Sequence, residues 1–203
     1  MPVRHALLAA CVAAGWGLNF VVIDVGLDSF PPLLFVALRF TLTALPAVFL
    51  VGRPGVGWRA VVGLGLFTST GQFALLFVAI DQGLPAGLAS LVLQVQAVFT
   101  IALAVLLLGE RPAARQLAGA MLATTGIGVI ALGRGGDVAL LALAACVLAG
   151  ASWAVGNIVT RCARPSAPLA LVVWSSLIPP IPLAALSLGV EGSAAWSEAF
   201  ANL

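Results

Sequence analysis

Seven long apolar stretches run through this chain, and they restrict it to a protein that crosses a lipid bilayer several times. Apolar residues make up 62% of the 203 residues, and charged residues only 8%. A soluble body of this length could not hide so much apolar surface, because a compact fold leaves much of its surface in water. The surroundings of the chain must therefore be apolar too.

The apolar stretches predict membrane-spanning helices. Each is long enough to cross a hydrocarbon layer of about 30 Å as a helix. They are continuously apolar, whereas the strands of a membrane barrel would be about ten residues long and would alternate. The predicted fold class is therefore all-α, a multi-pass helical bundle. The predicted spans cover residues 6–26, 33–51, 59–80, 86–108, 116–133, 138–160 and 168–190.

Arginines fall in every second gap between these spans. This pattern is typical of the cytoplasmic side of a membrane protein, so we expect a cytoplasmic N-terminus, an outer end at Leu203 and a location in the cell (inner) membrane. The first apolar run continues well past Cys11, which favours a retained helix over a cleaved signal peptide. The arginine-rich side holds Arg4, Arg53, Arg59, Arg111, Arg115, Arg161 and Arg164, and the other side holds Asp28, Asp81, Arg134, Asp137, Glu191 and Glu198.

The sequence repeats itself once, at a shift of 137 positions. Trp16 then falls on Trp153, and Pro31 falls on Pro168, which opens the following span in both cases. A small residue also recurs at every fourth position of both helices, which predicts a face for close helix packing. The small residues Ala9, Ala13 and Gly17 fall on Cys146, Gly150 and Ala154.

The repeat has a topological consequence. The first unit, residues 1–135, contains five predicted spans, and five is an odd number. The second unit, residues 136–203, therefore starts from the opposite side of the membrane and contains two spans. Such inverted repeats are typical of secondary transporters, with a substrate site between the units near mid-membrane. The chain is expected to be a fragment or a truncated form.

Several segments resemble EamA-type proteins of the drug/metabolite transporter superfamily. They are "GWGLNFVVIDVGLDSFPPLLFVALRF" at 15–40, "GLPAGLASLVLQVQAVFTIAL" at 83–103, "LLGERP" at 107–112, "SWAVGNIV" at 152–159 and "PLALVVWSSLIPPIPL" at 168–183. The resemblance is closest to the O-acetylserine/cysteine exporter branch. It implies ten helices in two inverted five-helix halves, of which three helices would be missing here, and export by alternating access. Asp24 stands where such proteins often carry a lysine.

A charge inside the bilayer needs a partner or a function. Arg39 lies seven residues into the second span, about 10 Å along the helix. Its guanidinium is suited to bind a substrate carboxylate through two parallel hydrogen bonds. The alternatives are a structural ion pair with Asp24 or Asp28, or a side chain that extends outward so that its charge reaches the membrane surface. Glu110, at the end of the fourth span, is expected to form a structural ion pair with its neighbour Arg111.

Amide and indole side chains within the spans complete the candidate site. Ser90 and Gln94 share a small, polar helical face with Gly87, which suits a cavity wall. The alternative for each glutamine is an interhelical hydrogen bond. Asn19 and Asn157 lie on the two repeat-related helices and are expected to face each other across a central site. The predicted substrate-binding residues are Trp16, Asn19, Arg39, Gln72, Gln94, Gln96, Trp153 and Asn157.

Other functions lack the residues they need. An intramembrane enzyme needs catalytic groups such as a nucleophile with a base or a pair of carboxylates. His5 is the only histidine, and the sequence has no GxSG motif and no pair of mid-membrane aspartates. No metal spacing occurs among the three cysteines, and no cofactor is expected. The net charge of +2 follows from topology, so nucleic acid is not an expected partner. The expected partners are a small-molecule substrate and the lipid bilayer, with a second copy of the chain as a further candidate. The competing interpretation is a non-transporting membrane scaffold or an inactive fragment.

Overall fold

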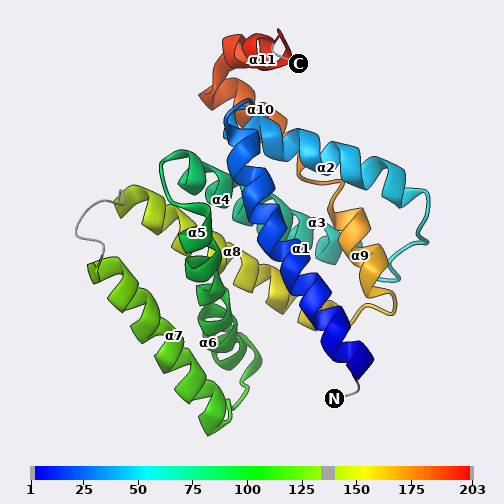
Figure 1. Cartoon of the computed structure of the whole chain (residues 1–203). Helices are drawn as coiled ribbons and strands as arrows, with labels where there is room; N and C mark the ends of the chain where they lie inside the picture. The colour runs from blue at the N-terminus through cyan, green and yellow to red at the C-terminus, as the bar shows by residue number, and fades with distance from the viewer. Residues whose placement is uncertain (1–2, 134–139, 202–203) are drawn as a thin grey trace.

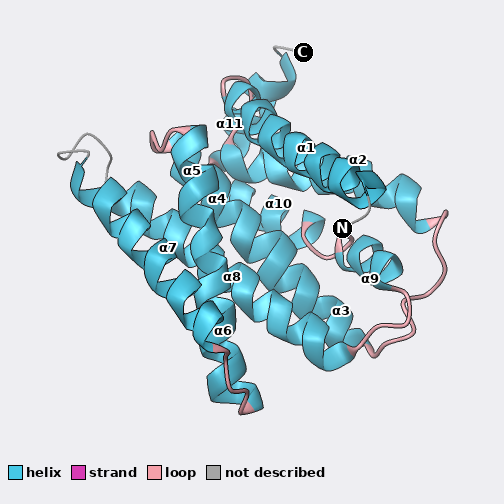
Figure 2. Cartoon of the chain, turned by 60° about the horizontal axis from the view of Figure 1, so that its bottom comes forward, coloured by secondary structure: helices cyan, strands magenta, loops and turns pink. Residues whose placement is uncertain are grey.

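The computed structural model describes residues 3–133 and 140–201. These residues form helices joined by loops and contain no strand (Figures 1 and 2). The prediction of an all-α, multi-pass membrane protein is confirmed. The predicted boundary between the two repeats, together with Arg134 and Asp137, lies outside the described residues.

Each predicted span contains a helix. In the described part of the chain, five helical stretches are long and apolar enough to cross a membrane, and α2 and α7 occupy the predicted spans 33–51 and 116–133. The helices are α1 (Val3–Leu27), α2 (Pro32–Val48), α3 (Trp58–Leu64), α4 (Gln72–Asp81), α5 (Ala86–Val92), α6 (Gln96–Leu108), α7 (Ala114–Gly133), α8 (Leu140–Ala163), α9 (Pro168–Ser175), α10 (Pro180–Val190) and α11 (Gly192–Ala201).

Consecutive spans run alternately in opposite directions (Figure 1). Helix α1 leads away from the N-terminus, α2 returns, and α3–α4, α5–α6, α7, α8 and α9–α10 continue the alternation. The N-terminus and helix α11 therefore lie at opposite ends of the bundle. The loops that carry Arg53, Arg111 and Arg164 lie at the end that holds the start of α1, which we call the inner end. The opposite end is called the outer end.

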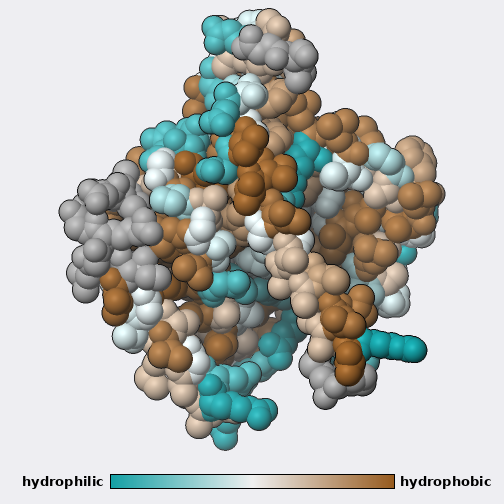
Figure 3. Space-filling model, viewed as in Figure 1, coloured by the Kyte–Doolittle hydropathy of each residue, from teal (hydrophilic) through white to brown (hydrophobic). Residues whose placement is uncertain are grey.

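The core lies where α2, α4, α5 and α8 meet, around residues such as Phe77, Val36 and Leu76. Apolar side chains are also spread over the face of the molecule that Figure 3 shows. Leu42, Leu106 and others remain more than two-thirds exposed in the isolated chain. A surface of this kind is suited to contact with acyl chains rather than water.

Two predicted spans change helical type along their length. A π-helical segment, Gly65–Gly71, joins α3 to α4, and a 3₁₀ turn, Leu93–Val95, joins α5 to α6. The last span is interrupted between Ser175 and Pro180, because proline removes a backbone donor and clashes with the preceding turn. Helix α11 was not expected from the sequence.

Helix α2 and the α9–α10 span are joined at both ends. At the outer end, the Glu191 carboxylate accepts hydrogen bonds from the backbone N–H groups of Leu33 (2.6 Å) and Leu34 (3.2 Å) at the start of α2. A carboxylate there is stabilised by the helix dipole. At the inner end, the Trp174 indole N–H donates to the Gly52 carbonyl at 3.0 Å. This pair of contacts sets α2 beside α9–α10.

The small-residue stripe behaves differently in the two repeat-related helices. In α8, Cys146, Gly150 and Ala154 are buried, as the packing prediction requires. Gly150 is so close to its neighbours that a Cβ there would lie 2.6 Å from a methyl of Val95. In α1 the equivalent residues are exposed and line a cavity, so for that helix the packing prediction is wrong. The α1 stripe leaves room for a cavity instead of a helix contact.

Candidate functional site

The two repeat-related tryptophans stack on each other. Trp16 of α1 and Trp153 of α8 have ring centroids 5.1 Å apart and planes inclined by 14°. Their helices cross in opposite directions (Figure 1). Offset stacking of this kind is a favoured aromatic geometry and contributes about 1 kcal/mol beyond the buried area. The stack fixes α1 to α8 at this point.

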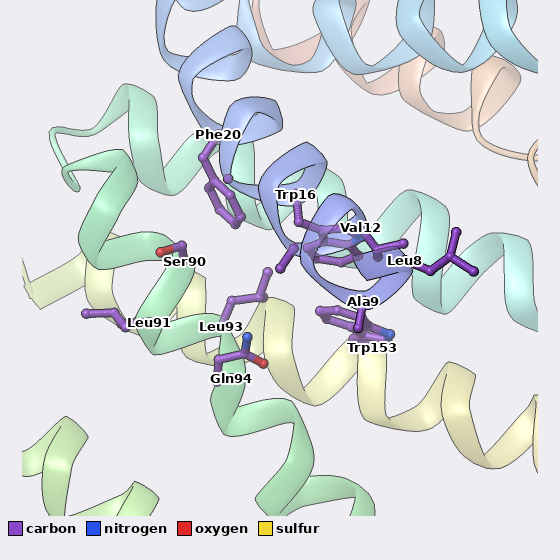
Figure 4. Close-up of a pocket in the computed structure, with 12 residues that line it drawn as sticks. Leu8, Ala9, Val12, Trp16, Phe20, Ser90, Leu91, Leu93, Gln94 and Trp153 are labelled. Atoms are coloured by element: carbon purple, nitrogen blue, oxygen red, sulfur yellow. The ribbon is translucent and has the colours of Figure 1, made fainter. Parts of the chain in front are cut away.

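A cavity of about 680 Å³ lies against the stacked pair, between α1, the α5–α6 span and α8 (Figure 4). Most of its wall is apolar, including Val12 and Phe20. The polar groups are the Ser90 hydroxyl and the exposed Gln94 amide, which lie four positions apart on one helical face as the sequence predicts. An apolar cavity of this size with a few placed polar groups is typical of small-molecule sites.

A second polar cluster lies further toward the inner end. The Asn157 amide of α8 donates hydrogen bonds to the Gln96 side-chain oxygen (3.0 Å) and to the Thr100 hydroxyl oxygen (3.1 Å) on α6. The Thr100 hydroxyl donates to the Gln96 backbone carbonyl at 2.7 Å. Gln96 and Asn157 thus use at least part of their hydrogen-bonding capacity to join two helices. For Gln96, an interhelical hydrogen bond was the alternative to substrate binding.

Asn19 and Arg39 lie together in a third place. They line a cavity of about 330 Å³ between α1 and α2. Asn19 therefore does not face Asn157 across a central site, and that prediction is wrong. The Arg39 guanidinium lies over the Phe73 ring, 4.8 Å from its centroid. Its Nη1 is buried and has no hydrogen-bond partner among the described residues.

The ion pairs proposed from the sequence do not form as expected. Among residues 3–133 and 140–201, the only ion pair joins Glu110 to Arg161 of α8 at 2.9 Å, so Arg39 pairs with neither Asp24 nor Asp28. Glu110 does not pair with its neighbour Arg111. Gln72 is buried at the start of α4 and lines none of the cavities described above. The eight predicted site residues thus occupy separate places rather than one pocket.

The π-helical segment holds polar groups whose geometry the sequence did not predict. The Thr70 hydroxyl donates to the Gly65 carbonyl of its own helical segment at 3.0 Å. The Thr68 hydroxyl is buried without a partner in the described structure. Ser152 of α8 donates to the Phe67 carbonyl at 2.7 Å. Segments of π-helix often occur at functional sites, and here the segment faces α8.

No group of three or more histidine, cysteine, aspartate or glutamate side chains in the described part of the chain could hold a metal ion. The arrangement offers stacked rings, amides and an unpaired guanidinium nitrogen. These groups can bind a small polar molecule by stacking and hydrogen bonding, and they do not form a nucleophile with a base.

The sequence of the chain is similar to those of known transporters. Residues 4–132 match the model of the EamA-like transporter family. The chain is 48% identical over 201 residues to a probable amino-acid metabolite efflux pump of Escherichia coli, and 47% identical over 199 residues to the protein of that name from Salmonella typhimurium. These alignments cover 96% and 95% of the chain, and 67% of each relative. An uncharacterized transporter of Bacillus subtilis is 29% identical over 163 residues, which are 76% of the chain and 53% of that protein. No solved structure matches the chain significantly.

Proposed function

Because this chain belongs to the EamA-like transporter family, within the drug/metabolite transporter superfamily, we propose that it exports small amino-acid-like metabolites from the cytoplasm. It is a multi-pass membrane transporter and not an enzyme. The names of the E. coli and S. typhimurium relatives support amino-acid metabolites as the substrate class. Within that class we propose O-acetylserine and cysteine, in line with the resemblance to the exporter branch that handles them.

The observation that carries this proposal is the cavity beside the Trp16–Trp153 stack. Its volume accommodates a small amino acid. The Gln94 amide can donate and accept hydrogen bonds there, and the Ser90 oxygen can accept one, since its hydroxyl donates to the Gly87 carbonyl. The two indoles are 137 positions apart, which is the shift of the sequence repeat. Equivalent residues of two inverted units touch each other only near the axis that relates the units. A substrate site on that axis supports transport by alternating access.

We assign the remaining predicted residues to positions along the same path. The cavity beside the Trp16–Trp153 stack is called the central cavity. Gln96 and Asn157 form the hydrogen-bonded cluster between it and the inner end. Asn19 and Arg39 form the cavity between α1 and α2, where the unpartnered guanidinium nitrogen supports binding of a carboxylate. Gln72 is assigned to packing near the π-helical segment. In the cell, the arginine-rich inner end faces the cytoplasm and the N-terminus is cytoplasmic.

Export assays test this function directly. Cells that produce the protein should release more O-acetylserine and cysteine into the medium than cells with an empty vector. Liposomes that contain the purified protein should take up the same amino acids, while protein-free liposomes should not. Export that is unchanged for every amino acid tested would favour a non-transporting scaffold.

Replacement of Arg39 with alanine should abolish export without lowering the amount of protein in the membrane, because the substrate carboxylate loses its charged partner. Lysine at this position keeps the charge but not the paired donors, so Arg39→Lys should retain a fraction of the activity. Export rates and membrane abundance by immunoblot are measured in parallel. An equal loss of abundance would assign Arg39 to folding instead.

A further inference from the structure

A separate cavity opens at the inner end of the bundle, between α6, α7 and α8. Its volume is about 340 Å³, and its lining includes Glu110, Arg111 and Arg161. The central cavity beside Trp16 and Trp153 has no charged residue in its lining. The inner cavity therefore combines charges of both signs at the end where we expect the cytoplasm.

The charges of this cavity are already arranged as a pair. Glu110 and Arg161 form an ion pair at 2.9 Å, and their side chains remain 38% and 54% exposed. An ion pair this exposed contributes little to folding stability. A structural role therefore does not by itself explain why these two charges lie together. Arg111 lines the same cavity, and the three groups together leave one net positive charge. These charges remain accessible to a ligand.

The deeper wall of the inner cavity is polar. Gln96 and Thr100 line it, and both accept hydrogen bonds from Asn157 of α8. Gln94, two positions earlier in the same span, lines the central cavity instead. A single stretch of the α5–α6 span thus presents an amide to each cavity. The inner cavity is therefore next to the central one and separated from it by this span.

We propose that the inner cavity is a loading site for zwitterionic α-amino acids on the cytoplasmic side. The ammonium and carboxylate groups of an α-amino acid are attached to one carbon, so their spacing is comparable to that of a contact ion pair. Such a molecule lies antiparallel on the Glu110–Arg161 pair, with its ammonium against Glu110 and its carboxylate against Arg161 and Arg111. Every charge then has an opposite neighbour and a charge-assisted hydrogen bond.

This site rests on the proposed function, because it supplies the substrate that the central cavity transports. It also makes the ion pair a selectivity element. A molecule with a carboxylate but no ammonium leaves Glu110 beside a second negative charge, which disfavours binding. The inner cavity therefore favours zwitterions over simple organic anions, whereas the uncharged central cavity has no such means of discrimination.

Initial transport rates test the loading site. The purified chain is reconstituted in liposomes with its inner end facing outward, and uptake of cysteine and of N-acetylcysteine, which lacks the ammonium, is measured. We expect Glu110→Gln and Arg161→Gln to raise KM for cysteine about ten-fold with kcat nearly unchanged, since a charged hydrogen bond to the substrate is lost. Glu110→Asp, which keeps the charge with a shorter reach, should give an intermediate KM. Wild-type uptake of N-acetylcysteine should be poor, and Glu110→Gln should raise it, because the substitution removes the negative charge that repels the carboxylate.

Arg115→Gln is the matched control, because it removes one positive charge from the same end of the bundle at a residue outside the cavity lining. Its KM should equal the wild-type value. Unchanged KM in the Glu110 and Arg161 variants, or an equal rise in Arg115→Gln, would overturn the loading site while the wild type still transports cysteine. Absence of amino-acid uptake by the wild type would instead overturn the proposed function and the loading site with it.

Discussion

Trp153→Ala is expected to reduce export of O-acetylserine and cysteine by about ten-fold or more, because it removes one wall of the central cavity together with the stacked contact to Trp16. The rings are 5.1 Å apart and nearly parallel, so neither position can change without affecting the other. Trp153→Phe keeps an aromatic surface and should retain much of the activity. Export into the medium, normalised to membrane abundance, measures the effect.

Trp58→Ala provides the comparison for this experiment. Trp58 also belongs to an aromatic pair, with Trp174 at 5.8 Å, but it lies at the inner end and lines no part of the central cavity. Its loss should leave export close to the wild-type rate. If Trp153→Ala exports normally, or if both variants lose export to the same degree, the cavity beside the stack is not the transport site.

Gly65→Ala should strongly destabilise the folded protein. A Cβ at Gly65 would lie 2.6 Å from both the Ser175 backbone carbonyl and the Cβ of Ile178, and neither atom can rotate away. Insertion of a methyl group into a packed site costs about 1–3 kcal/mol when neighbours must move. The change also falls at the start of the π-helical segment, where α3 approaches the break between α9 and α10. A lower melting temperature in detergent is the expected result.

Gly63→Ala tests whether the Gly65 effect comes from the clash or from loss of a helical glycine. The added Cβ at Gly63 would meet the methyl groups of Val159 at 3.4 and 3.5 Å, which is close to ordinary contact. Alanine is otherwise the better helix former, by about 1 kcal/mol. Gly63→Ala should therefore be neutral or stabilising. Equal melting temperatures for the two variants would show that α3 does not approach α9 as closely as the structure indicates.

The fold was largely predictable because lipid imposes simple requirements on a chain. A span must be apolar and helical over about twenty residues, and both properties can be read from sequence. The break near Pro180 was predictable for a similarly local reason. The π-helical segment at Gly65–Gly71 was not, because it depends on how closely α3 approaches α9 and α8. No local sequence signal reports that distance.

The site was predictable only in part. The shift of 137 positions pairs Trp16 with Trp153, and in the structure these two rings stack on each other. It failed for Asn19 and Asn157, because antiparallel helices diverge from their crossing point. Asn19 lies three residues beyond Trp16 toward the outer end, and Asn157 lies four residues beyond Trp153 toward the inner end. At 1.5 Å per residue the two amides are displaced by about 10 Å along the helices.

Partners of the charged residues could not be read from the sequence either. Glu110 has Arg111 as its neighbour in the chain but pairs with Arg161, 51 positions away, because α6 packs against α8. Arg39 lies over Phe73 of α4 rather than beside the nearby aspartates. Packing between distant spans decides such pairs, and the apolar pattern that defines each span does not specify its neighbours.

Alkylation of a cysteine at position 94 tests whether the cavity beside the stacked tryptophans binds the exported metabolite. Gln94→Cys is made in a chain whose three native cysteines are replaced by alanine, and Ser197→Cys on α11 serves as the reference. The rate of reaction with a water-soluble maleimide is measured with and without O-acetylserine. O-acetylserine is expected to slow the reaction at position 94 and to leave the reaction at position 197 unchanged. Equal rates at position 94 with and without O-acetylserine would contradict binding in this cavity.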